Sequence, residues 1–301
     1  MLSPFAYVRP GSLEEALQHL RADGARVSAG GSDLLGCLRD GVFACSTMVS
    51  IAGLDELKGI TQRRDGSLRI GALTRVADVA HDPIIAERYR VLAQAASEVA
   101  SPQLRNQGTI GGNICQRPRC WYFRGDFHCL RKGGTTCYAL AGENQYHCVL
   151  GGARCYIVHP SDTAPALMAL DARIGIAGPG GTRTVPVDEF YLLPNVDVRR
   201  EAALEPGEIV TEILLPPPAS GARSAYLRRQ SGARRARGAE RRRPGPMALP
   251  GGRSGDRRQA ARCGDVPRGG RGRDAGRAPP QAERLQGSAL HRAARGGAGE
   301  A

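Results

Sequence analysis

Residues 105–113 read RNQGTIGGN, and residues 159–165 read HPSDTAP. The first stretch is a glycine-rich turn of the kind that allows backbone N–H groups to approach a phosphate, because glycine has no side chain to block the approach. Six of the nine cysteines of the chain lie between the two stretches, from Cys115 to Cys155. A phosphate-binding turn that leads into a cysteine-rich segment predicts a nucleotide cofactor beside a metal centre, and hence electron transfer.

The spacing of the cysteines favours an iron–sulfur cluster over a zinc finger. Cys129 follows Cys120 by nine residues, Cys137 follows after eight more, and Cys155 after another eighteen. None of them forms the CxxC pair that is typical of zinc ribbons and fingers. Four thiolates on one long loop suit a 4Fe–4S cluster, which takes one cysteine for each iron. Reduced buried cysteines and a structural zinc site remain as alternatives, and spacing alone does not select four of the six.

A second glycine-rich turn lies near the N-terminus, where residues 27–33 read VSAGGSD after a predicted strand. Glycines between a strand and a helical turn leave N–H groups free at a place where a pyrophosphate can bind. A purely structural turn fits these residues equally well. Cys37 and Cys45 lie close to this turn, and we expect both to pack as small apolar residues.

Hydrophobic periodicity predicts an α+β protein built from short elements. The predicted helices cover about 13–22, 84–99 and 164–170, and the predicted strands cover about 26–29, 47–51, 68–70, 173–177, 183–187 and 208–214. Ser12 and Glu15 have the spacing of a capping box at the start of the first helix. Thr74 is expected to cap a helical turn that ends at Val79, and a glycine-rich turn should join two strands into a hairpin at 173–187.

The positive charge of the chain is confined to its last part. Residues 228–301 contain 19 Arg and 6 acidic residues but no Lys, Phe, Trp, Tyr or Ile, whereas residues 1–227 contain 23 basic and 23 acidic residues. Such a segment cannot bury enough apolar surface to offset the entropy of ordering it, so we expect disorder. It is either a basic arm that binds nucleic acid or, as the absence of lysine favours, an out-of-frame translation that begins near residues 226–235.

Several classes of protein are disfavoured by what the sequence does not contain. It has no apolar run of about twenty residues, and its start lacks the charged and apolar regions of a signal peptide, so we expect a soluble protein that is made in the cytoplasm. In that compartment clustered cysteines are more often metal ligands than disulfides. The sequence has no Ser–His–Asp arrangement, no paired catalytic carboxylates and no Walker loop, which argues against a hydrolase.

Four motifs in the right order give the chain a resemblance to a known family. They are AGGSDLL at 29–35, IGALT at 70–74, LRNQGTIGGN at 104–113 and HPSDTAP at 159–165. Together they resemble the FAD-binding medium subunit of the xanthine dehydrogenase family of molybdenum hydroxylases over about residues 1–226.

The resemblance implies the FAD-binding fold shared with vanillyl-alcohol oxidase and p-cresol methylhydroxylase. It places one subdomain at 1–57 and a second, with the iron–sulfur loop 115–155, at 58–219. Residues 220–301 would then be a degenerate or frameshifted remnant of the C-terminal domain of the family.

The resemblance also implies the cofactor-binding residues. Those expected to contact FAD are Val27, Ser28, Ala29, Gly30, Gly31, Ser32, Asp33, Thr109, Gly112, Asn113 and Asp162. The cysteine segment resembles the insertion that holds a 4Fe–4S cluster in the FAD subunits of periplasmic aldehyde oxidoreductase and of 4-hydroxybenzoyl-CoA reductase. The ligands expected from this likeness are Cys120, Cys129, Cys137 and Cys155, with Cys115 and Cys148 outside the set.

The function implied is that of an oxidoreductase subunit that transfers electrons and has no catalytic side chain of its own. Its expected partners are a large subunit with a molybdenum cofactor and a small subunit with two 2Fe–2S clusters, from which electrons reach FAD and then an external acceptor. We expect no membrane or nucleic-acid partner, and a place in the cytoplasm, or in the periplasm by export together with a partner. The alternatives are a stand-alone flavin oxidoreductase and a nucleic-acid-binding protein with a basic tail.

Overall fold

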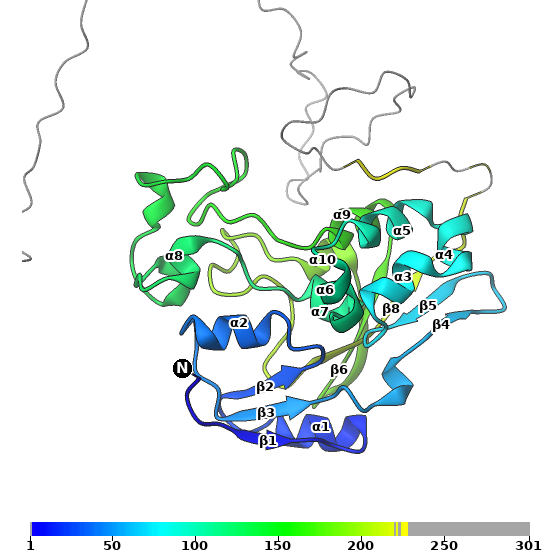
Figure 1. The fold of residues 1–301 in the computed structure, drawn as a ribbon, viewed down its shortest axis with the longest axis horizontal. Helices are drawn as coiled ribbons and strands as arrows, with labels where there is room; N and C mark the ends of the chain where they lie inside the picture. The colour runs from blue at the N-terminus through cyan, green and yellow to red at the C-terminus, as the bar shows by residue number, and fades with distance from the viewer. Residues whose placement is uncertain (1, 220, 222–223, 228–301) are drawn as a thin grey trace, which may run out of the picture. The chain divides into compact units, whose positions relative to one another are not determined.

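Two β-sheets and the helices around them make up the part of the chain that the computed structural model describes, which is residues 2–219, 221 and 224–227 (Figure 1). Residues 220–301 are interpreted from the sequence as a remnant domain, a disordered tail or a basic arm. Almost all of them lie outside the described part of the chain. The mixture of helices and strands confirms the predicted α+β class.

The first sheet has three parallel strands in the order β1-β3-β2. The elements of this region are β1 (Ala6–Val8), α1 (Leu13–His19), β2 (Ala25–Ser28), α2 (Leu34–Arg39), β3 (Thr47–Ser50) and η1 (Asp55–Leu57). A small core forms where Ala16 of α1 and Val49 of β3 pack together, and Leu73 and Ile209 from later parts of the chain join it.

The predicted capping box at the start of α1 is half right. The amide of Glu15 donates to the Ser12 hydroxyl at 3.2 Å, as expected. The Glu15 carboxylate, however, accepts from the amide of Gly11 at 2.6 Å, one residue before the position that a capping box requires.

The second sheet has five antiparallel strands in the order β4-β5-β8-β6-β7. Its strands are β4 (Ile60–Gln62), β5 (Leu68–Gly71), β6 (Arg173–Gly178), β7 (Gly181–Pro186) and β8 (Ile209–Leu215). The predicted hairpin is confirmed as β6 and β7, and Gly181 has a φ of +104°, which favours glycine. The last strand within the described residues, β8, lies at the centre of this sheet.

Short helices lie between β5 and β8 in sequence. They are α3 (Val76–His81), α4 (Pro83–Arg88), α5 (Arg90–Ser97), α6 (Pro102–Gln107), α7 (Ile110–Ile114), α9 (Thr163–Ala169) and α10 (Val187–Phe190). The single helix expected at 84–99 is in fact α4 and α5, because Tyr89 leaves helical geometry with φ −131° and ψ 46°. The expected cap at Thr74 is also wrong: its hydroxyl donates to the carbonyl oxygen of Gly59 at 3.1 Å, and Arg75 is the N-cap of α3.

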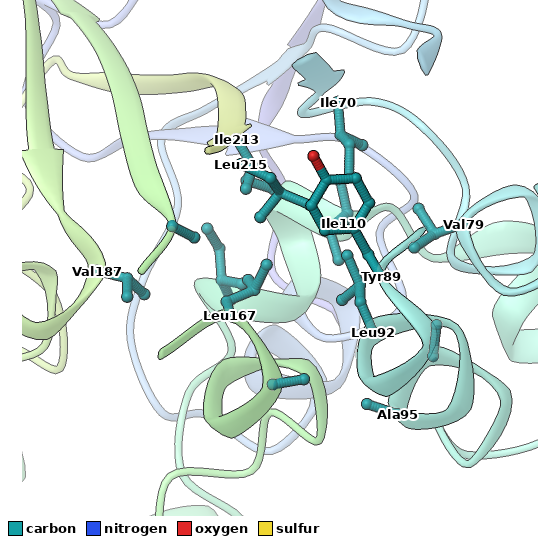
Figure 2. Close-up of a cluster of buried hydrophobic side chains, with 14 of the residues drawn as sticks. Ile70, Val79, Tyr89, Leu92, Ala95, Ile110, Leu167, Val187, Ile213 and Leu215 are labelled. Carbon is teal, nitrogen blue, oxygen red and sulfur yellow. The ribbon is translucent and has the colours of Figure 1, made fainter. Parts of the chain in front are cut away.

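The main hydrophobic core lies between these helices and the five-stranded sheet, as Figure 2 shows. Ile70 and Ile213 contribute from the sheet, and Leu92 and Leu167 contribute from α5 and α9; all four are fully buried. Burial of such side chains is the dominant favourable term in folding. This core therefore supports α7, whose residues Ile110 and Ile114 belong to it and whose first turn carries the second glycine motif.

A long segment with little regular structure joins α7 to α9. Within it lie only α8 (Trp121–Arg124) and the 3₁₀ turns η2 (Leu130–Lys132) and η3 (Tyr138–Leu140). Aromatic rings pack within the segment: the ring of Tyr122 lies 5.1 Å from that of Phe127. The two sheets fall on either side of residue 57, but the predicted subdomain boundary there stays a prediction. No helix in the described ranges has the length and apolar character needed to cross a bilayer.

Candidate functional site

The two glycine-rich turns line one cleft with a volume of about 450 Å³. Small-molecule sites have volumes of roughly 300–1,000 Å³, so the cleft is of the right size for a cofactor. Nine of the eleven residues expected to contact FAD line it, namely Val27, Ala29, Gly30, Gly31, Ser32, Asp33, Thr109, Gly112 and Asn113.

Ser28 and Asp162 have other surroundings. Ser28 is buried in β2, and its carbonyl oxygen accepts from the amide of Ile51 at 2.9 Å. Asp162 precedes α9, and its Oδ1 accepts from the hydroxyl of Tyr226 at 3.4 Å. Contact of either residue with FAD stays a prediction.

The first turn is packed directly against the end of α6. A Cβ atom at Gly30 would overlap the carbonyl oxygen of Gln107, whose side chain in turn donates to the Gly30 carbonyl at 3.0 Å. Gly31 has a φ of +72°, a conformation that glycine adopts without strain. The sequence Gly30–Gly31 is therefore required by the shape of this turn, which brings the backbone to the edge of the cleft.

The second turn is fixed by the caps of α7. Thr109 is the N-cap, and its hydroxyl accepts from the amide of Gly112 at 3.1 Å. Gly111 contacts Ala72 so closely that an added Cβ would lie 2.8 Å from the Ala72 side chain. At Gly112, by contrast, an added Cβ would meet only the Thr109 hydroxyl, so glycine leaves room on the cleft side.

Asn113 connects the second turn to the HPSDTAP motif. Its Oδ1 accepts from the hydroxyls of Ser161 at 2.7 Å and of Thr163 at 2.6 Å, and all three side chains are buried. Sequence reasoning did not select Ser161 or Thr163, although hydroxyl groups inside a motif that precedes a helix were a usable signal. The pair holds the wall of the cleft at Asn113 in place.

Asp33 has a role that the sequence did not predict. Its Oδ1 accepts from the guanidinium of Arg124 at 2.8 Å and lies 3.3 Å from that of Arg119, and its Oδ2 accepts from the amide of Arg117 at 2.8 Å. The carboxylate that lines the cleft therefore also anchors the first part of the cysteine segment. It is one of the causes, after burial, that raise the pKa of Cys37 to about 11.

A second, more open cavity of about 600 Å³ lies beyond the first turn and shares Gly30, Gly31 and Ser32 with the cleft. Arg39, Arg119 and Arg124 line it together with Asp40, which pairs with Arg39 at 3.2 Å. With Asp33, which pairs with the other two arginines, the group has one more cation than carboxylates. Cationic side chains beside glycine turns suit a diphosphate, because arginine pairs with phosphate oxygens through two parallel hydrogen bonds.

All four cysteines expected to bind a cluster, Cys120, Cys129, Cys137 and Cys155, line one small cavity in the segment between α7 and α9. Cys115 is elsewhere: it packs against the main core, and burial raises its pKa to about 12. Over the residues that the structure describes, no three His, Cys, Asp or Glu side chains are arranged as a metal-binding group. The thiols thus share a cavity without being in coordination geometry.

The surroundings of this cavity fit an anionic centre. Arg131 lines it with a side chain that is only 1% exposed, and its Nε and Nη2 atoms have no hydrogen-bond partner within the described part of the chain. Burial raises the pKa values of Cys120 and Cys155, which keeps them as thiols when no cation is bound. Four thiolates bound to a metal centre would carry negative charge and would give these buried N–H groups the hydrogen-bond acceptors that they lack.

One residue at this cavity was missed by sequence reasoning. Arg131 gave no signal, because its partners lie far away in the sequence. His147 lies in the same segment but does not line the cavity, and its Nε2 lies 3.2 Å from the sulfur of Cys120.

The chain combines a small parallel sheet and a larger antiparallel sheet with a cleft that two glycine-rich turns line. This combination is typical of proteins that bind a nucleotide cofactor. The sequence profile described as "FAD binding domain in molybdopterin dehydrogenase" matches residues 3–218. The chain belongs to this family, and the resemblance and the fold expected from the four motifs are confirmed.

Individual relatives agree with this placement. The chain is 38% identical over 225 residues to the aldehyde oxidoreductase FAD-binding subunit PaoB of Escherichia coli K12, a match that covers 73% of this chain and 70% of that protein. It is 31% identical over 226 residues to the putative xanthine dehydrogenase FAD-binding subunit XdhB of the same strain, covering 74% of this chain and 62% of that protein.

Among solved structures, the carbon monoxide dehydrogenase from Hydrogenophaga pseudoflava that lacks the Mo-pyranopterin moiety of its cofactor has a similar chain. The TM-score is 0.54 and the identity 28%, over 73% of this chain and 62% of the other. The chain thus spans about two thirds of the length of these relatives.

Proposed function

We propose that this chain is the FAD-binding, electron-transfer subunit of a molybdenum hydroxylase complex and that its cysteine segment holds a 4Fe–4S cluster. The observation that carries the proposal is the pairing of two sites. Nine expected FAD contacts line one cleft, and four expected cluster ligands line one cavity with the buried guanidinium of Arg131, whose Nε and Nη2 have no hydrogen-bond partner among the described residues.

In the cleft, the residues of this chain bind and orient FAD. The turns at Gly30–Gly31 and Gly111–Gly112 bring backbone to the cofactor, and the nearby arginines offset phosphate charge. FAD supplies a carrier that takes electrons singly and passes them in pairs. Asn113, held by two hydroxyl groups, gives a rigid wall that keeps the site in one geometry.

In the cysteine cavity, Cys120, Cys129, Cys137 and Cys155 would each provide one thiolate. A 4Fe–4S cluster supplies a one-electron carrier, with a potential that its surroundings set between roughly −700 and +450 mV. Arg131 offers N–H groups to the sulfur atoms, and Tyr122 and Phe123 also line the cavity. A zinc ion on the same thiolates is the competing occupant.

The partners proposed are a large subunit with a molybdenum cofactor, where the substrate reacts, and a small subunit with 2Fe–2S clusters. Support comes from the relatives, which are named as subunits of an aldehyde oxidoreductase and of a putative xanthine dehydrogenase. We propose subdomains at 1–57 and 58–219, and a place in the cytoplasm or, with an exported partner, the periplasm.

The test is anaerobic purification of the full chain, followed by assays of flavin, iron and zinc and by electron paramagnetic resonance of the reduced protein. We expect about one FAD and about four iron atoms for each chain, with the signal of a reduced 4Fe–4S cluster. FAD with zinc and no iron would overturn the cluster and leave the flavin subunit. A folded chain that takes up neither FAD nor iron would overturn the whole proposal.

A further inference from the structure

Three charged residues connect the cysteine cavity with the flavin cleft: Glu201 and Arg131 are buried, and the side chain of Arg117 is 30% exposed. Glu201 lies in the connection between α10 and β8, and its side chain is only 7% exposed. One of its oxygens, Oε1, pairs with Nη1 of Arg131. The other, Oε2, lies 3.0 Å from Nε of Arg117.

The two arginines face different sites. Arg131 lines the cavity of the four cysteines, and Arg117 lines the cleft between the two glycine turns. Arg117 is also oriented by aromatic rings, since its guanidinium carbon lies 5.3 Å from the ring centre of Phe123 and 5.8 Å from that of Phe43. A single carboxylate therefore positions both cations, one toward each site.

A buried arrangement of this kind is costly to leave incomplete. Taking charges out of water carries a desolvation penalty that is repaid only when each charge has partners. Nε and Nη2 of Arg131 still lack a partner within the described residues, although the group is buried. The Arg117–Glu201–Arg131 triad thus has a net charge of one positive unit, with two cations and one carboxylate. An anionic group in either site would neutralise it.

We propose that Glu201 is a positioning residue that couples the two cofactor sites electrostatically, by holding Arg131 toward the cluster and Arg117 toward the flavin. This inference rests on the proposed function. Because charges interact strongly at low dielectric, the triad sets the reduction potentials of both cofactors together. A positive charge near a cofactor favours the added electron, and a negative charge disfavours it.

The direction in which each reduction potential shifts depends on the charge that a variant removes. Glu201→Gln removes the negative charge between the two sites, so the potentials of both FAD and the cluster rise. Arg131→Gln removes the cation at the cluster, so the cluster potential falls more than that of FAD. Glu212→Gln is the control, because Glu212 pairs with Arg69 at 2.6 Å on β8 and lines neither cavity; neither potential should change.

A second pair of variants covers the case in which Glu201→Gln does not fold. Arg117→Gln removes one of the two ion-pair partners that Glu201 has within the described residues, so the cluster potential falls together with that of FAD. Arg26→Gln is its matched control. Arg26 lines the same cleft and stacks on the same Phe43 ring, with its guanidinium carbon 4.9 Å from the ring centre, but it makes no ion pair with Glu201. It should lower the FAD potential alone.

The experiment is a spectroelectrochemical titration of the purified full chain, with flavin and iron contents measured for each variant. Shifts of both potentials in Glu201→Gln, or of both in Arg117→Gln but not in Arg26→Gln, support the coupling. Full contents of FAD and iron with only one potential changed overturn the coupling and leave the proposed function intact. A wild-type chain with FAD but without iron overturns the proposed cluster, and the coupling with it, and leaves the flavin subunit.

Discussion

The side-chain oxygen Oδ1 of Asn113 accepts a 2.7 Å hydrogen bond from the hydroxyl of Ser161, which lies 48 residues later in the chain. The same oxygen accepts from Thr163 at 2.6 Å, and the Ser161 hydroxyl in turn accepts from the amide of Ala164 at the start of α9. The second glycine turn and the HPSDTAP motif are therefore one structural unit, although a long cysteine segment separates them.

This contact gives the first prediction. Asn113→Ala removes the acceptor of two buried hydroxyl groups, and a buried group that loses its partner costs about 1–3 kcal/mol. We expect the free energy of unfolding to fall by about 2 kcal/mol, and FAD affinity to fall with it, as measured by urea unfolding and flavin fluorescence. Ser97→Ala, which removes an exposed hydroxyl bonded to Gln94, is the control. Equal stability of the two variants would contradict the role of Asn113.

The first glycine turn gives the second prediction. Gly30→Ala puts a methyl group where the carbonyl oxygen of Gln107 lies, so the turn must move away from α6. Overpacking of this kind costs about 1–3 kcal/mol, and the displaced turn should lower FAD affinity at least about tenfold. Gly53→Ala is the matched control, because a Cβ there meets nothing within 4 Å. Titration with FAD checks both, and unchanged affinity in Gly30→Ala would rule out this turn as a binding element.

The cysteine cavity gives the third prediction. Serine in place of Cys120, Cys129, Cys137 or Cys155 should abolish or strongly lower the iron content while FAD content stays near that of the wild type. Cys148→Ala is the control, since Cys148 lies in the same segment but does not line the cavity. Iron assays decide the matter. If Cys148→Ala loses iron and one of the four serine variants keeps it, the ligand set is different from the one proposed.

His159 gives the fourth prediction, which concerns pH. Burial lowers its pKa from the ordinary 6.5 to about 4, and Nε2 has no hydrogen-bond partner among the residues described. Above pH 6.5 the ring is neutral in the folded and the unfolded chain, so it has no effect. Between pH 6.5 and 4 only the unfolded chain takes up the proton, so stability falls as pH falls; below pH 4 the loss is complete.

The expected loss from this residue is about 3 kcal/mol between pH 6.5 and 4, because one unit of pKa corresponds to about 1.4 kcal/mol. His159→Phe keeps a ring beside Tyr191, whose ring centre lies 4.7 Å away, and does not titrate. Urea unfolding of both proteins at pH 7.5, 5.5 and 4.5 measures the difference. Parallel pH dependence of wild type and His159→Phe would show that folding does not lower the pKa of His159.

Local patterns predicted the strands of the hairpin and both glycine turns, because turn chemistry and alternation are properties of short stretches. The break at Tyr89 was not predictable in this way. Ile85, Tyr89 and Leu92 are all buried as a continuous helix would require, and the break coincides with a tertiary contact, a 2.9 Å hydrogen bond from the Tyr89 hydroxyl to the carbonyl oxygen of Pro216.

The residues of the candidate site also include some that local sequence patterns predicted and others that they did not. Nine cleft residues followed from motifs that are contiguous in sequence. The partners of Asp33 lie 84 and 91 residues away, and Glu201 lies 70 residues from Arg131. No local sequence pattern predicts contacts over such separations. The four cysteines were selected by family resemblance, because their spacing alone fits several metal centres.

The central position of β8 has a consequence for the order in which the protein is made. Its neighbours β5 and β6 are joined only through it, so the five-stranded sheet cannot close until residues 209–215 have left the ribosome. Until then the hairpins β4–β5 and β6–β7 each have an unpaired edge strand. Pairing of strands over such long sequence separations is slow. A chaperone that shields these edges during synthesis should therefore raise the yield of folded chain, and a chain cut before Ile209 should aggregate.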